Sequence, residues 1–158
     1  MRIAIAIFLV VIFGSACAME PDQAFDNLID AMYQKDAEVL MSYLSTESLG
    51  LIDFLLVTLK EEPAENIAEY AEDLDLKLTV EEIGDWASVD FVEEFITAQV
   101  FINELPPRED LLSSGFEVHG DSSIVFVNYD SLAPRRILMV KEEGNWKLDQ
   151  RVIGSFMI

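Results

Sequence analysis

The sequence predicts an α+β domain in which N-terminal helices pack on a curved, C-terminal antiparallel sheet of about four strands. Three observations predict this class. Apolar residues recur every three or four positions from Phe25 to Ile102, which is the period of helices with one buried face. After Ser113 the period falls to two, in runs rich in Val, Ile, Phe and Tyr. Short links that contain glycine join those runs, and helices followed by such hairpins form an α+β architecture.

The first residues have the composition of an export signal. Arg2 is followed by an unbroken apolar run, Ile3–Phe13. Its 11 residues are fewer than the roughly 20 that a membrane-spanning helix needs, which favours a secretory signal peptide and leaves an uncleaved anchor as the alternative. We therefore expect residues 1–18 to be removed and residues 19–158 to form one α+β domain, since about 140 residues is the size of a single domain.

The only cysteine of the chain, Cys17, lies where a lipid attachment site would be. The segment Gly14-Ser15-Ala16-Cys17 resembles a bacterial lipobox, which predicts cleavage before Cys17 and a diacylglycerol on its thiol. Ala16-Cys17-Ala18 also fits the pattern of ordinary signal peptidase, which would make Met19 the N-terminus. We predict a periplasmic or cell-surface protein that is lipid-anchored at Cys17. A lone cysteine forms no internal disulfide, so the core must provide the stability.

Acidic residues are concentrated in the first two thirds of the chain. Ten basic and thirty acidic residues give a net charge of −20. From Glu20 to Asp110 there are 24 acids and 4 bases, a net −20, whereas from Leu111 to Ile158 there are 6 acids and 5 bases, a net −1. Such a surface repels nucleic-acid phosphates and anionic lipid heads, so nucleic acid is excluded as a partner, and membrane contact is expected only through the N-terminal anchor. The acidic face is either simply solvated or a docking face for a cationic partner.

Three helices are predicted before Pro63, each with a polar residue at its start. The expected N-caps are Asp22, Asp36 and Ser45. The first two helices have apolar stripes at helical spacing, from Phe25 to Met32 and from Ala37 to Leu44. The next segment, Leu49–Leu59, contains a single charged residue, Asp53. Because a helix that is apolar on most sides is buried on most sides, Leu49–Leu59 is predicted to be the central helix.

Three further helices are predicted between Pro63 and the Pro106-Pro107 pair. An amphipathic stretch runs from Ile67 to Leu74. Thr79-Val80-Glu81-Glu82 has the sequence of a capping box and begins a short helix that ends at Trp86. Ser88 is the expected cap of the last helix, which is predicted to be continuous because one stripe holds Phe91, Phe95, Ala98 and Ile102.

Four strands are predicted after Ser113, in the segments GFEVH, SIVFVNY, RRILMVK and WKLDQRVI. Gly120-Asp121 and Glu143-Gly144-Asn145 are the expected hairpin turns. In the last strand Trp146 and Leu148 alternate with Lys147 and Asp149. This alternation predicts a half-buried antiparallel strand with Asp149 on the face opposite to Trp146.

Two segments resemble the nuclear-transport-factor-2-like superfamily. AFDNLIDAMYQKDAEVLMSYLS is similar to the opening of that family, a helix, a polar break ending in Asp36-Ala37, and a second helix with Leu44 at its end. KEEGNWKLDQRVIG is similar to the family's last hairpin, where a tryptophan begins the final strand. The resemblance implies a cone in which long N-terminal helices close over a bent sheet and leave a pocket at the wide end. It points to secreted, lipoprotein-type members of unassigned function. Where the family usually places a strand after the second helix, Ser45–Leu105 is predicted to be all helical.

Few residues are suited to metal binding. His119 is the only histidine, and one histidine with one cysteine cannot supply the three or four ligands of a zinc site, so no metal or other cofactor is predicted. Asp73 and Asp75 lack the glycine and glutamate spacing of a calcium loop and are expected to be solvated. Arg135-Arg136 is the only basic pair and is expected to flank a strand as an edge charge.

Asp53 is the one candidate catalytic residue. Since it lies in an apolar helix, it is the carboxylate most expected to be desolvated, and a desolvated carboxylate is suited to general acid–base chemistry. Isomerases and dehydratases of the resembled family use an Asp base with a Tyr or acid donor. That resemblance implies Tyr33, Tyr43 or Tyr129 as the donor here, although Asp53 matches no family motif position.

Together these features predict an exported, acidic, non-catalytic binding domain tethered to a bacterial membrane. Its partner would be a protein or a small apolar ligand held by the cone. One alternative is an acidic inhibitor or immunity-type protein that neutralises a basic partner. The other is a small isomerase- or dehydratase-like enzyme that uses Asp53.

Overall fold

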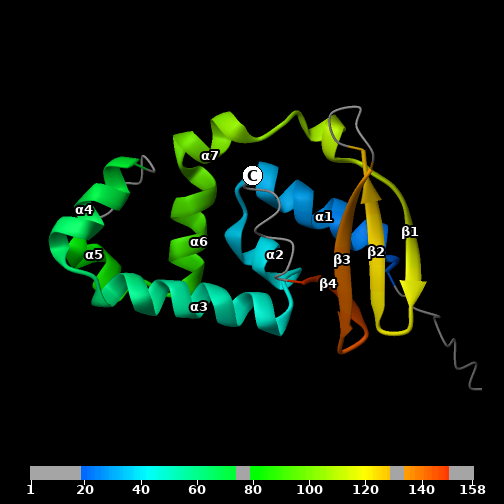
Figure 1. Ribbon diagram of the computed structural model, residues 1–158, viewed down its shortest axis with the longest axis horizontal. Helices are drawn as coiled ribbons and strands as arrows, with labels where there is room; N and C mark the ends of the chain where they lie inside the picture. Colours follow the sequence, from blue (N-terminus) through cyan, green and yellow to red (C-terminus); the bar gives the residue numbers. More distant parts are fainter. Residues whose placement is uncertain (1–18, 74–78, 129–133, 150–158) are drawn as a thin grey trace, which may run out of the picture.

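The predicted fold class is confirmed. The computed structural model describes residues 19–73, 79–128 and 134–149. Across these residues, seven α-helices and one 3-10 helix precede a four-stranded antiparallel sheet (Figure 1). The expected signal peptide with Cys17, as well as Asp75 and Tyr129, lies outside them. Among the described helices, none combines the length and the apolar character that crossing a bilayer requires.

The first two helices begin as their terminal residues dictate. Helix α1 (Pro21–Gln34) starts two residues earlier than a cap at Asp22 would allow, so that prediction is wrong. Proline at the first helical position needs no hydrogen-bond partner for its nitrogen, and the N-cap is therefore Glu20. Helix α2 (Ala37–Ser42) has the predicted cap, because the Asp36 carboxylate accepts the N–H of Val39 at 3.0 Å.

The next three helices form the helical lobe: α4 and α5 lie on the left in Figure 1, and α3 runs along the lower edge from the centre toward them. In α3 (Thr46–Glu61) the predicted cap is confirmed, since the Ser45 hydroxyl accepts the N–H of Ser48 at 3.1 Å. Helices α4 (Ala64–Asp73) and α5 (Val80–Asp85) follow. The predicted capping box begins α5: Thr79 accepts the N–H of Glu82 at 3.3 Å and the Glu82 carboxylate accepts the N–H of Thr79 at 3.1 Å. A small core holds this lobe together, built from Leu56, Ile67 and Ile83.

The predicted helix through Ile102 is in fact two helices. Helix α6 (Ser88–Thr97) ends where Ala98 has an extended ψ of 137°, and α7 (Gln99–Glu104) begins directly after it. The Thr97 hydroxyl donates to the carbonyls of Glu93 and Glu94 at 2.8 and 3.1 Å, a local bond that competes with the helical ladder. Ser88 is not the cap, because it already lies in the helix, and the N–H of Ala87 is satisfied by the Asp90 carboxylate at 2.7 Å.

The sheet is an antiparallel meander in the order β1-β2-β3-β4. A short 3-10 helix, η1 (Arg108–Leu111), leads into β1 (Ser113–His119), which is followed by β2 (Ser122–Val127), β3 (Arg135–Glu142) and β4 (Asn145–Leu148). Both predicted hairpin turns are present. At the second, Glu143 and Gly144 have φ of 50° and 84°, the positive values that a type I′ hairpin turn requires at both central positions.

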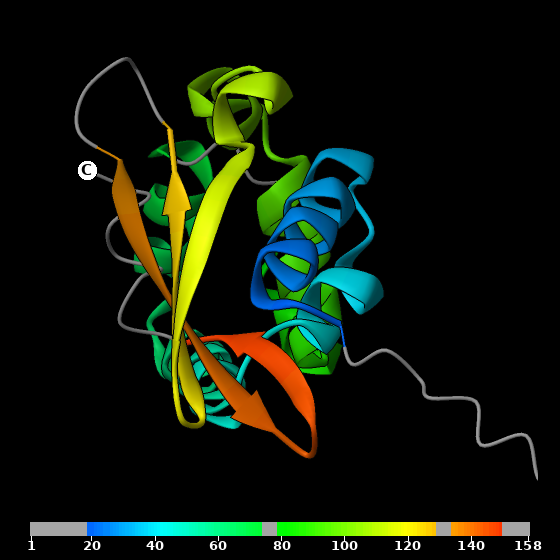
Figure 2. The same cartoon turned by 90° about the vertical axis from the view of Figure 1, so that its right-hand side faces the viewer.

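Helix α1 is the central helix of the molecule. It lies against one face of the sheet (Figure 2), and Phe25, Val125 and Met139 in this layer are 0% exposed. The prediction that Leu49–Leu59 is the central helix is wrong. Helix α3 packs on α5 and α6 and buries Ile52 and Leu56, but Phe54 on its other side is 64% exposed. The apolar character of Leu49–Leu59 therefore exceeds what the fold buries.

A main-chain connection fastens α2 and α3 to the last strand. Leu44 and Leu148 form a parallel β-bridge. The N–H of Leu148 donates to the carbonyl of Tyr43 at 2.7 Å, and the N–H of Ser45 donates to the carbonyl of Leu148 at 3.0 Å. From Ser45 to Leu105, the described residues contain helices but no strand, as predicted. The connection brings the start of α3 against the β3–β4 hairpin.

Candidate functional site

A hollow of about 330 Å³ lies between the start of α3 and the β3–β4 hairpin. Its apolar lining comes from Met41, Leu44 and Leu49, and its polar lining from Ser42, Thr46, Glu142, Glu143, Asn145 and Lys147. The main-chain bridge between Leu44 and Leu148 holds the two sides of the hollow together. The volume is at the small end of the range for ligand pockets.

Two of the three charged side chains that line this hollow, Glu142 and Lys147, bond to the helix ends beside it, whereas Glu143 is exposed. The Glu142 carboxylate accepts the backbone N–H of Thr46 at 2.9 Å and the Thr46 hydroxyl at 2.8 Å. The Lys147 ammonium donates to the carbonyl of Ser42. Because both charges are bonded to the helix ends beside them, they anchor the hairpin to α2 and α3 rather than offering an open charge to a ligand.

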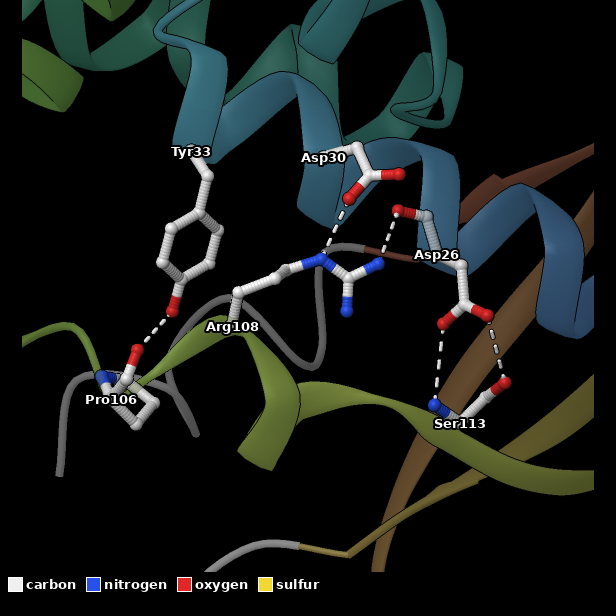
Figure 3. A network of polar contacts seen from close by, with 6 residues as sticks. All are labelled: Asp26, Asp30, Tyr33, Pro106, Arg108 and Ser113. Carbon is white, nitrogen blue, oxygen red and sulfur yellow. Dashed lines mark hydrogen bonds and ion pairs between the residues drawn. The ribbon is translucent and has the colours of Figure 1, made fainter.

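A second polar cluster joins α1 to the chain that enters the sheet (Figure 3). Arg108 donates from Nε to the Asp30 carboxylate at 2.6 Å and from Nη2 to the carbonyl of Asp26 at 3.4 Å. The Asp26 carboxylate accepts the N–H and the hydroxyl of Ser113, both at 3.2 Å. Tyr33 donates its hydroxyl to the carbonyl of Pro106. These bonds fix η1 and the first residue of β1 against α1.

One atom of this cluster is left unsatisfied. Arg108 Nη1 is buried without a hydrogen-bond partner among the described residues. The side chain as a whole is 25% exposed, however, and Asp30 beside it is 50% exposed. The guanidinium already has a carboxylate and a carbonyl of α1 as partners. We therefore interpret the cluster as a structural clamp that holds η1 against α1.

The outer side of α3 presents three of the large apolar side chains that are exposed among the described residues, including the most exposed of them, Phe54. Phe54 is 64% exposed, Val57 54% and Leu55 45%. Residues three and four positions apart are neighbours on a helix, so Leu51, Phe54, Leu55 and Val57 form one stripe. We call these four residues the α3 stripe; Leu51 is half-buried and the other three are exposed. Figure 1 shows α3 along the lower edge of the helical lobe, with no described element beneath it.

Acidic side chains surround the α3 stripe. From Glu47 to Glu72 the chain has seven acids, namely Glu47, Asp53, Glu61, Glu62, Glu65, Glu69 and Glu72, and one base, Lys60. All of these acids except the half-buried Glu62 are exposed. The one base donates to the carbonyl of Trp86 at 2.7 Å. The stripe is thus an apolar surface inside a strongly negative one.

Asp53, the predicted catalytic candidate, is exposed. The expectation that its helix would desolvate it is wrong, because α3 is covered on one side only and Asp53 lies toward the open side. Its carboxylate accepts a hydrogen bond from the Ser88 hydroxyl. The tyrosines considered as its donors bond elsewhere: Tyr33 to Pro106, and Tyr43 as the acceptor from Asn27 at 3.2 Å. None of these bonds joins a tyrosine to Asp53.

The remaining candidates lie apart from one another. His119 ends β1 with its side chain 63% exposed, and its Nε2 is 3.6 Å from the Glu117 carboxylate. Arg135 and Arg136 begin β3 and pair there with β2, whereas β4 pairs with β3 only from Met139 to Glu142. Asp73 is the last residue of α4. Within the part of the chain that the structure describes, no three His, Cys, Asp or Glu side chains come together in a way that could hold a metal ion.

The buried carboxylate of the described residues is Asp149, which sequence reasoning placed on the face opposite to Trp146. It is 2% exposed. Strand β4 ends at Leu148, and the N–H of Asp149 donates to the carbonyl of Leu138 at 3.1 Å. Because Asp149 follows the last residue of the strand, the alternation of β4 does not determine which way its side chain points. No signal in the sequence marks that point.

Comparison of the chain with protein-family models, with curated proteins and with solved structures finds no match. The resemblance to nuclear-transport-factor-2-like domains accordingly stays a prediction.

Proposed function

We propose that the chain is an exported, acidic, non-catalytic binding domain, tethered to a bacterial membrane by a lipid on Cys17. The observation that carries the binding role is the exposure of Phe54, Leu55 and Val57 on α3. Scattered apolar residues are normal on a protein surface, whereas a contiguous group of large ones is typical of an interaction site. Covering these side chains removes apolar area from water, at about 25 cal/mol for each Å².

The fold supports a binding role in a second way. The α3 stripe belongs to a lobe whose own small core, Leu56, Ile67 and Ile83, lies on the opposite side of α3. The helix is therefore held in place by contacts that do not involve the stripe. A surface of this kind can be covered by a partner without any rearrangement of the domain.

The tether is tested by the intact mass of the protein recovered from the membrane fraction of a bacterium that processes lipoproteins. We expect a chain that begins at Cys17 and carries a diacylglycerol. The Cys17→Ser variant serves as control and should be recovered without lipid. An unmodified wild-type chain that begins at Met19 would refute lipid tethering and leave simple secretion.

The binding role is tested by a photo-crosslinking residue placed at position 54 and, for comparison, at position 118. Both positions are exposed, Phe54 on α3 and Val118 on β1. In intact cells we expect a defined crosslinked species from position 54 only. Equal crosslinking from both positions would contradict a specific role for α3.

An acidic inhibitor or immunity-type protein is the second candidate. The specific observation in its favour is the excess of seven acids over one base between Glu47 and Glu72. Association with a basic protein is steered by charge and weakens as salt rises. Without crosslinking, the amount of partner pulled down from the cell envelope should then fall between low and high salt, and a partner recovered equally at both would disfavour this candidate. An isomerase-like role would need a desolvated Asp53, whereas this carboxylate is exposed.

A further inference from the structure

We propose that the outer face of α3 binds a basic amphipathic helix of a protein partner, with the apolar side of that helix on the α3 stripe and its lysine or arginine side chains against the flanking acids. This inference rests on the binding role proposed above and assigns the surface and the chemistry of the partner. The observation that supports it is the alternation of apolar and acidic residues along the exposed side of α3.

The apolar part of the surface has the dimensions of a helix–helix contact. Leu51 and Leu55 lie four residues apart on one row of the helix surface, and Phe54 and Val57 lie three apart beside them. The segment from Glu47 to Glu61 is about 21 Å long at 1.5 Å per residue. A partner helix of about four turns matches this length, and its apolar residues at i, i+3, i+4 and i+7 would cover the stripe.

The charges around the stripe select a basic partner. Along the rows of the helix, Val57 lies between Asp53 and Glu61, each four residues away, and Leu51 lies four residues after Glu47. Carboxylates therefore flank the apolar residues at both ends and on one side. The Asp53 carboxylate is held by Ser88, and Glu61 is exposed. A helix whose basic residues border its apolar stripe would pair with these groups as it covers Phe54.

The same charges exclude two other occupants. In a symmetric dimer through α3, two segments that each carry seven acids and one base would face each other, which is repulsive at the low dielectric of an interface. An anionic lipid surface would be repelled in the same way. A basic amphipathic helix is the occupant that satisfies both the apolar and the acidic residues.

The experiment measures binding of a dye-labelled peptide by fluorescence anisotropy, using the soluble chain from Met19. The probe is a peptide of leucine and lysine at helical spacing, about 14 residues or four turns long. A peptide of the same pattern with glutamate in place of lysine is the charge control. We expect the lysine peptide to bind and the glutamate peptide not to bind. Affinity for the lysine peptide should fall as salt is raised.

Variants localise the interaction. The double variant Phe54→Ser/Val57→Ser should weaken binding by about tenfold or more, because large apolar side chains at the centre of a contact provide most of its affinity. Leu112→Ser/Val118→Ser is the matched control, since these residues are 47% and 48% exposed elsewhere in the molecule, and it should bind as the wild type does. Glu61→Gln should weaken binding and reduce its salt dependence, whereas Glu109→Gln should change neither.

Several outcomes would overturn the inference: no binding of the lysine peptide, equal binding of the glutamate peptide, or equal loss in both double variants. Sedimentation of the free chain as a dimer that Phe54→Ser/Val57→Ser dissociates would assign the stripe to a second copy instead. Binding to neutral or anionic vesicles through the same residues would assign it to lipid. None of these results would refute the lipid tether or the binding role of α3, because intact mass and crosslinking test those two proposals separately.

Discussion

Single carboxylates fasten the ends of helices in this protein, from near and from far in the sequence. Asp36 caps α2 through the N–H of Val39, three residues away. Glu142 does the same for α3 from 96 residues away, where it accepts the N–H and the hydroxyl of Thr46. A negative group at a helix N-terminus satisfies an unpaired donor and also interacts favourably with the helix dipole. Glu142 therefore stabilises α3 and holds the β3–β4 hairpin against it.

Replacing Glu142 should reveal this dual role. We expect Glu142→Ala to lower the free energy of unfolding by about 1–2 kcal/mol, the cost of losing a cap that is also a charge-assisted hydrogen bond. Glu142→Gln keeps an acceptor oxygen and should lose less. Glu93→Ala, which removes an exposed acid from the middle of α6, is the control and should stay within about 0.5 kcal/mol. Urea unfolding at constant m-value is the measurement, and equal effects of Glu142→Ala and Glu93→Ala would show that the contact contributes nothing.

Whether a residue's role could be predicted from sequence depends on how local its partner is. The caps Asp36, Ser45 and Thr79 were predictable, because each bonds a backbone N–H three residues ahead. Glu142 was not, since nothing in KEEGN indicates which helix will lie beside the turn. The same holds for the clamp of Arg108 with Asp26 and Asp30, whose members are 82 and 78 residues apart.

At the scale of elements, the apolar content of a helix predicted its presence but not its place. Leu49–Leu59 is more apolar than α1, yet α1 lies against the sheet and α3 has one exposed side. Hydrophobic periodicity measures how much surface a helix can bury, whereas neighbouring elements decide how much it does bury. In α1 the carboxylates of Asp30 and Asp26 accept hydrogen bonds from Arg108 and Ser113 at the edge of the core. In α3 the excess apolar residues form the candidate site.

Two phenylalanines measure this difference directly. Phe25 in α1 is 0% exposed and Phe54 in α3 is 64% exposed. We expect Phe25→Ala to cost about 3–5 kcal/mol and Phe54→Ala to stay within about 0.5 kcal/mol, because alanine leaves no cavity at an exposed position and favours the helix. Should Phe25→Ala fail to fold, Phe25→Leu at a cost of about 1 kcal/mol serves in its place. The measurement is urea unfolding of each purified variant. An equal cost at both positions would mean that the outer side of α3 is covered in the free protein.

For the molecule as a whole, charge and fold divide the chain at nearly the same point. The helical residues from Glu20 to Asp110 have a net charge of −20, and the part that contains the sheet has −1. This division was visible in the sequence, as was the change of period near residue 113. What could not be seen was the apolar stripe within the acidic part, because it depends on which side of α3 the rest of the lobe covers. A fold-level pattern thus predicted the architecture, whereas the candidate site required the packing.

Repulsion among the acidic side chains of the helical lobe should lower the free energy of unfolding by a measurable amount. On α4, Glu65 and Glu69 are four residues apart and Glu69 and Glu72 three apart, so like charges are neighbours on one side of the helix. Each such pair destabilises by about 0.2–0.5 kcal/mol. The triple variant Glu65→Gln/Glu69→Gln/Glu72→Gln removes both pairs and should therefore be more stable than the wild type at low salt, by about 0.4–1 kcal/mol in total. The gain should shrink in about 1 M salt, where the screening length is about 3 Å.

Neutralising Glu117 and Glu143 on the sheet provides the comparison for this prediction. Both side chains are exposed, and they belong to the part of the chain where acids and bases nearly balance. The double variant Glu117→Gln/Glu143→Gln should change stability little and with no marked dependence on salt. Urea midpoints at low and high salt decide between the two cases. If the triple variant on α4 gains no more than the double variant on the sheet, repulsion within the acidic lobe does not limit stability, and its acids are simply a solvated surface.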